Sequence, residues 1–294
     1  MTCIARPSND VTPLPADTLP RSERPGDAPW PARATVSAQR LSGGKAVASV
    51  ETLIEEVPVA LVYNGVSHAV MLASPGDLED FALGFSLSEG ILHARGELYD
   101  CEFVTAAEGI EVRLDIAAAR MFGLQARRRS LAGRSGCGLC GVDSLQAALR
   151  PPAPVPPRAA LPAAAIQRVL AELTEWQPLH RATGAAHAAA WASNDGVLQL
   201  VREDVGRHNA LDKLIGALAR RRVVPATGFA VVTSRASYEM VQKAAAAGIG
   251  LLAAISAPTA FAVRVADAAH VTLVGLARPG RLTAYSHAHQ LTGP

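Results

Sequence analysis

The chain has few cysteines and very few lysines, and neither sign of charge dominates it. Four cysteines in 294 residues, Cys3, Cys101, Cys137 and Cys140, are too few for a disulfide scaffold and indicate a reducing compartment. With 28 basic and 26 acidic residues, the net charge of +2 argues against a general binder of nucleic acid or membrane surfaces. Only three basic residues are lysine, so a single arginine carries little information here.

Long uninterrupted hydrophobic segments are also missing. The start of the chain, MTCIARPSND, lacks the basic head and apolar run of a secretory signal. Residues 244–263 carry no charge, but glycine, serine, proline and threonine interrupt them, which predicts a helix end, a buried strand and a helix start rather than a membrane span. Alanine contributes 57 residues to the 49% hydrophobic fraction, and the larger apolar residues still suffice for a core. We therefore expect a soluble, cytoplasmic protein.

Proline marks two breaks in composition. Seven prolines within residues 7–31 predict a disordered tail over residues 1–35. The run PPAPVPP predicts a connector over residues 151–160 between two lobes. The smaller N-terminal lobe, residues 36–150, is predicted to be α+β, and residues 161–294 are predicted to form a layered α/β domain.

In the N-terminal lobe, a β pattern precedes a helical one. Residues 47–74 alternate and are rich in valine, with Asn64 and Gly65 within them, which predicts a hairpin. A helix capped by Ser74 is expected over residues 75–92. It is expected to bury Leu78, Phe81, Phe85 and Leu87. Two strands, over 98–104 and 110–116, and a short helix over 142–149 complete the predicted lobe.

In the C-terminal domain, helices and strands alternate, and we find no internal repeat. A helix over residues 162–176 is expected first, then a hairpin over 185–204 that turns at residues 194–196. Helices are expected after it over residues 205–221, 236–247 and 258–268, and strands over 228–233, 249–255, 270–275 and 281–286. This alternation predicts an α/β layer with helices packed on a partly parallel sheet.

The most suggestive segment for chemistry is Ser135-Gly136-Cys137-Gly138-Leu139-Cys140-Gly141. Its three glycines predict a mobile backbone that presents both thiols to a partner. Four arginines precede it at positions 127–129 and 134, and a helix is expected after it. Both features lower a cysteine pKa and favour the reactive thiolate. The pattern therefore indicates a nucleophilic sulfur.

Several interpretations of this CxxC pair compete. A structural zinc site needs four ligands, but there is no second CxxC and Cys3 lies in the predicted tail. A zinc deaminase needs His-x-Glu and Pro-Cys-x-x-Cys; no histidine has Glu two positions on, and Gly136 stands where proline belongs. Buried inert thiols fit poorly with a glycine-rich loop. A thioredoxin-like dithiol and a persulfide-carrying thiolate both fit, and the loop alone does not separate them.

Polar residues also gather at three expected strand-to-helix junctions. The segment from Arg202 to Lys213 holds seven ionisable residues, of which Arg207, His208 and Lys213 could assist the helix start in binding phosphate. The alternative is a solvated helix start capped by Asp204. Two further junctions, residues 233–237 and 256–259, also follow apolar strands, with Pro258 fitting a first helical position. Such junctions meet at the carboxyl edge of a sheet, where nucleotide-like ligands bind, although no Walker or GxGxxG motif is present.

A last segment, residues 276–281, places two arginines around a Pro-Gly turn between expected strands. On its own it predicts an ordinary hairpin, and a cradle for an anionic ligand needs support from elsewhere.

Taken together, the motifs resemble one family. Residues 55–91, GCGLCGV at 136–142, REDVGRHNALDKLIG at 202–216, SRASYEMVQKAAAAGI at 234–249 and residues 257–287 are similar, in this order, to the FdhD-type formate dehydrogenase accessory sulfurtransferases. The similarity spans roughly residues 45–290 and rests on several long motifs. It departs at Ala185 and Ala186, where related sequences commonly have a bulkier or polar pair.

The resemblance implies a cytidine deaminase-like α/β fold without catalytic zinc, in a cytoplasmic homodimer. It implies a sulfur carrier that takes sulfur from a cysteine desulfurase. The carrier passes the sulfur to the molybdenum cofactor, as bis-molybdopterin guanine dinucleotide, for formate dehydrogenase. Cys137 matches the persulfide-bearing cysteine and Cys140 its companion. The implied cofactor-binding residues are Leu276, Ala277, Arg278, Pro279, Gly280 and Arg281, where guanine nucleotides could mimic the cofactor. No resident metal, nucleic acid or membrane partner is expected. A cofactor-binding chaperone without sulfur transfer and a thiol-disulfide oxidoreductase remain as alternatives.

Overall fold

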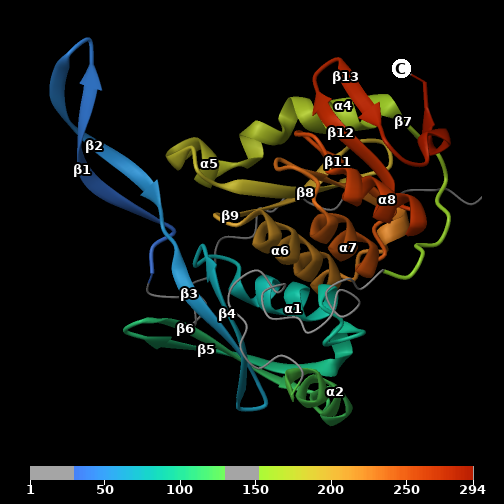
Figure 1. Cartoon of the computed structure of the whole chain (residues 1–294), viewed down its shortest axis with the longest axis horizontal. Helices are drawn as coiled ribbons and strands as arrows, with labels where there is room; N and C mark the ends of the chain where they lie inside the picture. The colour runs from blue at the N-terminus through green and yellow to red at the C-terminus, as the bar shows by residue number, and fades with distance from the viewer. Residues whose placement is uncertain (1–29, 130–151, 294) are drawn as a thin grey trace, which may run out of the picture.

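The computed structural model describes residues 30–129 and 152–293 (Figure 1). The loop with Cys137 and Cys140, the helix predicted over 142–149 and residues 1–29 of the predicted tail lie outside the described residues. Within them, two mixed sheets alternate with helices, which confirms the α/β character. No helix of this described part is long and apolar enough to cross a membrane.

The N-terminal unit is a four-stranded sheet in the order β4-β3-β6-β5. Its strands are β3 (Val57–Tyr63), β4 (Val66–Ala73), β5 (Leu98–Ala106) and β6 (Gly109–Ile116). β3 and β6 run parallel, and the other pairs are antiparallel. Helices α1 (Leu78–Ser88) and α2 (Ala118–Arg129) share one apolar core with this sheet, in which Phe81, Leu61 and Leu114 are almost fully buried. A 3-10 turn, η1 (Arg95–Glu97), precedes β5.

The structure confirms some N-terminal predictions and corrects others. The hairpin at Asn64-Gly65 is present, as are the two strands after α1. Residues 47–54, however, belong to a second hairpin that the sequence does not predict, in which β1 (Arg33–Ser42) pairs with β2 (Lys45–Ile54) around two glycines. The sequence also does not predict helix α2, because its arginines read as part of the segment that leads to the cysteine loop.

The cap predicted for α1 is wrong. The helix begins at Leu78, later than expected, and Asp77 stands at the cap position in a left-handed conformation without a side-chain bond. Ser74 bonds elsewhere: its backbone N–H donates to Asp204 Oδ2 at 3.0 Å, and its hydroxyl accepts from the backbone N–H of Val205 at 3.0 Å. Ser74 therefore joins the N-terminal unit to the C-terminal one.

The C-terminal unit is a six-stranded sheet in the order β13-β12-β11-β10-β8-β9. Its strands are β8 (His187–Ser193), β9 (Leu198–Asp204), β10 (Gly228–Val232), β11 (Leu251–Ala254), β12 (Thr272–Arg278) and β13 (Arg281–Ala284). β10, β11 and β12 run parallel, and the flanking strands are antiparallel. The partly parallel sheet, the hairpin that turns at residues 194–196 and the alternating helices are confirmed.

Helices cover both faces of this sheet. One face packs on α6 (Arg207–Arg220), α7 (Tyr238–Ala246) and α8 (Ala260–Ala268), and the other on α4 (Ala163–Glu172). Alternation along each strand produces the two cores: Ala230 faces the first group of helices and Val231 faces α4. The smaller elements are β7 (Leu161–Pro162), η2 (Leu173–Trp176), α5 (Pro178–Thr183), η3 (Pro225–Thr227), η4 (Ala288–Gln290) and β14 (Leu291–Thr292).

Two local predictions in this unit need correction or extension. Pro258 is not the first residue of its helix; Thr259 caps α8 instead, and its hydroxyl accepts from the backbone N–H of Ala262 at 3.1 Å. In the proline-rich segment, Val155 is buried, and its backbone N–H donates to the carbonyl of Ala269 at 2.9 Å. Part of this segment therefore packs on the C-terminal unit.

Helix α1 joins the two units through an unusually close contact with α6 (Figure 1). A Cβ placed on Gly84 of α1 would lie 1.7 Å from the carbonyl oxygen of Asp212, and one on Gly216 of α6 would lie 1.9 Å from that of Asp80. Both distances are far below any tolerable contact, so each helix presents a glycine where the other backbone passes. The result is a stack in which α1 lies between the four-stranded sheet and the helices on the larger sheet.

Candidate functional site

The carboxyl edge of the six-stranded sheet brings together the polar segments singled out in the sequence. Main-chain hydrogen bonds join neighbouring segments there: Ile255 N–H donates to Val232, Thr259 N–H to Ala236 and Leu276 N–H to Ser256, at 3.0–3.1 Å. Thr233 N–H donates to Ala188 at 3.0 Å, and the end of β9 at Asp204 pairs with His187 beside it. We call residues 204–208, 233–237, 256–259 and 276–281 the carboxyl edge. The prediction that the junctions meet at one edge is therefore confirmed.

Residues 276–281 form the turn between β12 and β13 at this edge, which confirms the predicted hairpin. The side chain of Gln167 on α4 bonds to both sides of the turn. Its Nε2 donates to the carbonyl of Arg278 at 3.2 Å, and its Oε1 accepts from the backbone N–H of Gly280 at 2.9 Å. Ala277 is buried, whereas Arg278 and Arg281 are exposed. The turn therefore holds its backbone fixed and leaves both guanidinium groups open to an anionic ligand.

Leu276 adopts a conformation that is rare for its residue type. Its φ of 51° lies in the left-handed region, and the pairing of β12 with β13 shifts register between Gly275 and Arg278. A β-bulge redirects the strand, which turns the following residues away from the regular ladder. The residue implied as the start of the cofactor-binding stretch is thus the point where regular pairing ends.

At the start of α6, Asp204 organises the loop from inside. Its carboxylate accepts from the backbone N–H of Gly206 at 2.7 Å and from Asn209 Nδ2 at 2.9 Å, and it forms an ion pair with Lys213 Nζ at 2.6 Å. Because the Lys213 side chain is 1% exposed, the prediction that it assists phosphate binding is wrong. Asp204 is also not the helix cap, a position that Gly206 occupies.

Arg207 and His208 are half-buried at the edge. His208 Nε2 lies 2.8 Å from Glu239 Oε2 at the start of α7, and this hydrogen bond lowers the pKa of the Glu239 carboxyl. Burial, followed by the charge of Arg207, lowers the pKa of His187 at the start of β8. Arg207 Nε and Ser237 Oγ are buried and lack a hydrogen-bond partner within residues 30–129 and 152–293. The edge therefore offers these two polar groups to an anion.

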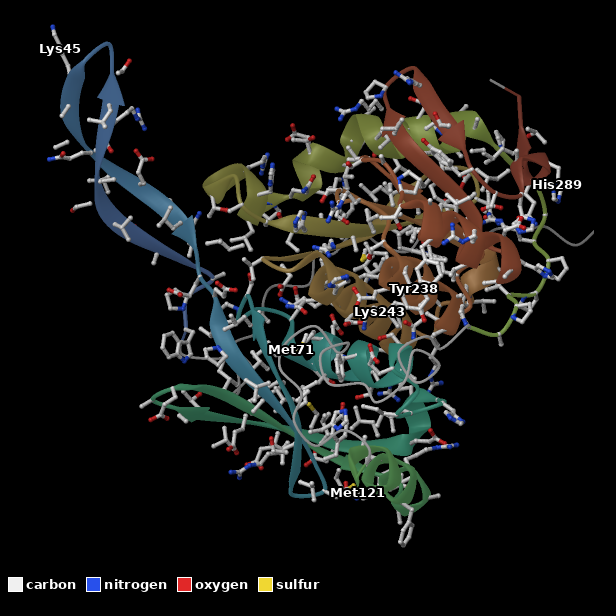
Figure 2. The ribbon with its side chains drawn as sticks, viewed as in Figure 1. Lys45, Met71, Met121, Tyr238, Lys243 and His289 are labelled. Carbon is white, nitrogen blue, oxygen red and sulfur yellow. The ribbon has the colours of Figure 1, made fainter. Side chains whose placement is uncertain are left out.

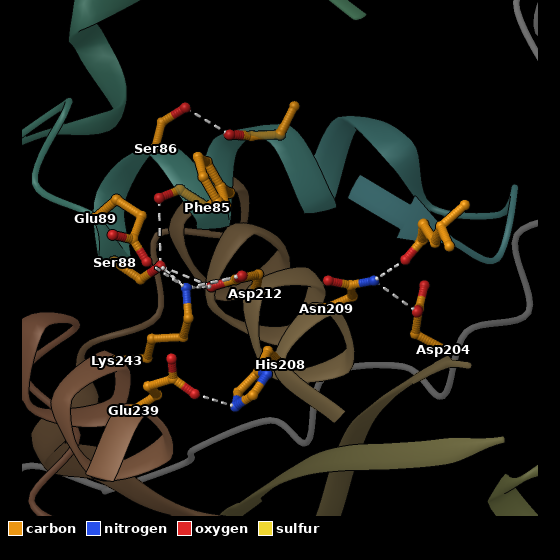
Figure 3. Close-up of polar contacts among 12 residues, drawn as sticks. Phe85, Ser86, Ser88, Glu89, Asp204, His208, Asn209, Asp212, Glu239 and Lys243 are labelled. Atoms are coloured by element: carbon orange, nitrogen blue, oxygen red, sulfur yellow. Dashed lines mark hydrogen bonds and ion pairs between the residues drawn. The ribbon is translucent and has the colours of Figure 1, made fainter. Parts of the chain in front are cut away.

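A second polar group lies deeper, between α1, α6 and α7 (Figure 3). Lys243 Nζ lies 3.0 Å from both oxygens of Asp212, 2.9 Å from Glu89 Oε1 and 3.0 Å from Ser88 Oγ. Burial disfavours the charged lysine, but the carboxylates of Asp212 and Glu89 outweigh it and raise the pKa of Lys243. Sequence reasoning missed this group, although two of only three lysines, Lys213 and Lys243, are the buried ones.

Cys101 is the one cysteine among the residues that the structure describes, and it is unsuited to nucleophilic chemistry. Burial raises the pKa of its thiol to about 12, so the thiolate is scarce at neutral pH. No group of three or more His, Cys, Asp or Glu side chains in the described ranges could hold a metal ion. The candidate nucleophiles Cys137 and Cys140 lie outside those ranges.

Comparison with known proteins gives one consistent result. The model of the FdhD/NarQ family matches residues 54–292. The chain is 55% identical over 266 residues to a sulfur carrier protein FdhD from Cupriavidus necator, covering 90% of this chain and 92% of the relative. It is 57% identical over 238 residues to a protein of the same name from Variovorax paradoxus, covering 81% and 86%.

A solved structure shares the fold. A crystal structure from Desulfotalea psychrophila, described as a candidate formate dehydrogenase accessory protein, matches with a TM-score of 0.69 and 23% identity. The match covers 89% of this chain and 100% of the other.

Proposed function

Since the chain belongs to the FdhD/NarQ family, we propose that it carries sulfur from a cysteine desulfurase to the molybdenum cofactor of a formate dehydrogenase. The observation that carries this proposal is the family match over residues 54–292, which includes the Cys137 loop. Relatives that are 55% and 57% identical bear the name of sulfur carrier protein.

The proposed loading step is an exchange at sulfur. The thiolate of Cys137 attacks the outer sulfur of the desulfurase persulfide, the S–S bond of that persulfide breaks, and the desulfurase leaves as a thiolate. Cys137 then holds a persulfide, with no net oxidation or reduction. The arginines and glycines around Cys137 favour the thiolate and its access to a partner. Cys140 is the proposed companion that shields or relays the sulfur.

The cargo is the proposed acceptor of this sulfur. When the sulfane sulfur leaves Cys137 for bis-molybdopterin guanine dinucleotide, the S–S bond breaks and Cys137 returns to the thiolate. Reduction of that sulfur to sulfide takes two electrons, which the molybdenum supplies as it is oxidised. The pyrophosphates of this cargo are anionic and its guanine ends are polar, so both suit the arginines of the carboxyl edge. The proposed contacts are Arg207, Arg278 and Arg281.

The loading step can be tested by mass spectrometry of the intact chain. After incubation with a cysteine desulfurase and cysteine, we expect a gain of one sulfur atom that a reductant removes. Cys137→Ala should abolish the gain, whereas Cys101→Ala, at the half-buried thiol with the raised pKa, should leave it unchanged. An unmodified wild-type chain, or full loading of Cys137→Ala and Cys140→Ala alike, would refute sulfur carriage by this loop.

A chaperone that binds the cofactor without transferring sulfur is the second candidate. The edge favours it independently, because its arginines could hold the cargo without any cysteine. One variant separates the two candidates. If the protein transfers sulfur, Cys137→Ala abolishes formate dehydrogenase maturation. The chaperone instead retains maturation in Cys137→Ala and loses it when Arg278 and Arg281 are both changed to alanine.

We also propose that the protein works as a homodimer in the cytoplasm, as the family resemblance implies. The likeness of the C-terminal unit to cytidine deaminases belongs to the same proposal. The observed six-stranded sheet with helices on both faces is consistent with it, and the missing His-x-Glu pattern is consistent with the absence of a catalytic zinc.

A further inference from the structure

The hairpin of β1 and β2, residues 33–54, projects from the rest of the molecule as a two-stranded arm (Figure 1). Ten residue pairs hold its strands together, from Arg33 with Ile54 to Ser42 with Lys45. Figure 2 places Lys45 at the tip, remote from both units. Only the base of the arm approaches the body, where β2 passes α5.

The arm exposes more apolar surface than its size explains. It carries five of the twelve large hydrophobic residues that are exposed in the described chain. These are Val36, Leu41, Val47, Val50 and Leu53, which are 37–77% exposed. The pairing register places Leu41 and Val50 on one face of the ribbon and Val36, Val47 and Leu53 on the other. Both faces are therefore partly apolar and open to solvent.

An isolated two-stranded ribbon of this kind is at best marginally stable in water. The sheet contains no third strand among the residues that the structure describes, so both long edges present free backbone groups. Exposed apolar strands with free edges are surfaces that pair with another chain. The arm therefore has the features of a surface that another protein chain covers.

Charge on the arm indicates what covers it. The distal part carries Arg40 and Lys45 and no acidic residue. The base carries Arg33 and Glu51, and Glu55 and Glu56 follow directly after β2, so the charge at the base is net negative. Arg40 also pairs with Glu51 of the same arm at 2.8 Å, both side chains being substantially exposed. When two copies of one arm lie antiparallel around a two-fold axis, the basic tip of each meets the acidic base of the other. Such self-complementarity suits a second copy of this chain.

From these observations we propose that the arm is the contact between two copies of the chain, lying antiparallel to its counterpart. The inference rests on the proposed homodimer and names the surface that forms it. The apolar side chains of both arms would be buried in the seam, and the tip of each arm would lie against the acidic base of the other.

Sedimentation velocity of the full chain tests the proposal. We expect the wild-type chain to sediment at twice its 30.6 kDa mass, and Val47→Lys with Val50→Lys to weaken dimerisation at least tenfold. The matched control is Val70→Lys with Leu72→Lys on β4, two valine- and leucine-sized residues that are 58% and 55% exposed outside the arm. The control should remain dimeric, and the circular dichroism of both variants should match the wild type.

Charge reversal tests the antiparallel arrangement without relying on a single fold-sensitive variant. Arg40→Glu with Lys45→Glu, and separately Glu55→Lys with Glu56→Lys, should each dimerise more weakly than the wild type. A mixture of the two variants should form a heterodimer, because each acidic tip then meets a basic base.

The outcomes separate the inference from the function on which it rests. A wild-type dimer that persists in all arm variants would overturn the arm and leave the homodimer. A wild-type chain that stays monomeric at 100 µM, roughly the upper range of weak specific association, would overturn both. Neither result affects sulfur loading on Cys137, which is measured separately.

Discussion

Replacing Lys243 with methionine should reveal what the buried charge group contributes to stability. Methionine keeps much of the length and the apolar stem of lysine but removes the ammonium group. Asp212, whose side chain is 1% exposed, would lose a cation that lies 3.0 Å from both of its oxygens. Glu89 is more exposed, at 34%, and can turn to water, so the cost falls mainly on Asp212.

Removing one partner of a buried ion pair typically costs about 3–5 kcal/mol, because the remaining charge is left buried. Asp212 keeps the hydroxyl of Ser88 at 2.6 Å and can take up a proton, both of which reduce the loss. We therefore expect Lys243→Met to lower the free energy of unfolding by about 3 kcal/mol. Adding Asp212→Leu should recover part of this loss, because the orphaned carboxylate is then removed.

Urea unfolding followed by circular dichroism and tryptophan fluorescence measures these differences. The matched control is Arg181→Met, which removes an equally short ion pair, 2.9 Å to Glu175, whose side chains are 49% and 75% exposed. It should cost less than about 1 kcal/mol. If Lys243→Met cost no more than this control, the reasoning that burial makes the Lys243 group costly to break would be refuted.

Three further predictions follow from the contacts described above. Gly84→Ala should destabilise the chain by more than about 2 kcal/mol in urea unfolding, because its Cβ would lie 1.7 Å from the backbone of Asp212. Gly123→Ala in α2, whose Cβ would have nothing within 4 Å, should be neutral or stabilising. Equal effects of the two substitutions would contradict the close crossing of α1 and α6. Hydrogen bonds from Arg120 and the backbone of His93 lower the pKa of Glu97 from 4.5 to about 2. Glu97→Gln should therefore lower the free energy of unfolding by about 1 kcal/mol above pH 4.5, and this difference from the wild type should shrink as the pH falls towards about 2. If the stabilities of the wild type and the variant differed by a constant amount from pH 2 to 7, the lowered pKa of Glu97 would not contribute to stability. Arg278→Ala with Arg281→Ala should weaken the binding of GDP, measured by calorimetry, by about tenfold or more without changing the thermal midpoint of unfolding. The control Arg113→Ala, at another exposed arginine, should not change GDP binding. Unchanged binding in the double variant would show that Arg278 and Arg281 do not contact the ligand.

The sequence was sufficient to predict most of the C-terminal unit. Buried strands such as Gly228–Val232 are short and uniformly apolar, and each is followed by a helix with an apolar stripe, so the local patterns agree with the final packing. The convergence of the polar junctions followed from the direction of the strands alone. Local pattern and global topology point the same way in this part of the chain.

Predictions failed where a partner distant in the sequence decides the role of a residue. Ser74 looks like a helix cap, but Asp204, 130 residues later, accepts its backbone N–H. Lys213 looks like a phosphate ligand, but the fold buries it against Asp204. Spacing along one helix does not show which polar side chains a second helix will cover. The scarcity of lysine was the available signal, because a chain that uses arginine by default retained Lys213 and Lys243 at buried positions.

The close crossing of α1 and α6 also bears on whether the two units can exist separately. Helix α1 is encoded in the first half of the chain, yet one side of it lies on glycine-to-backbone contacts with the second half. Cutting the chain in the proline-rich segment would leave the first fragment with a bare helix face and buried carboxylates such as Asp80, and the second with an uncovered α6. The fragments should therefore be insoluble when produced alone and should reassemble when produced together, as two pieces of a single folding unit.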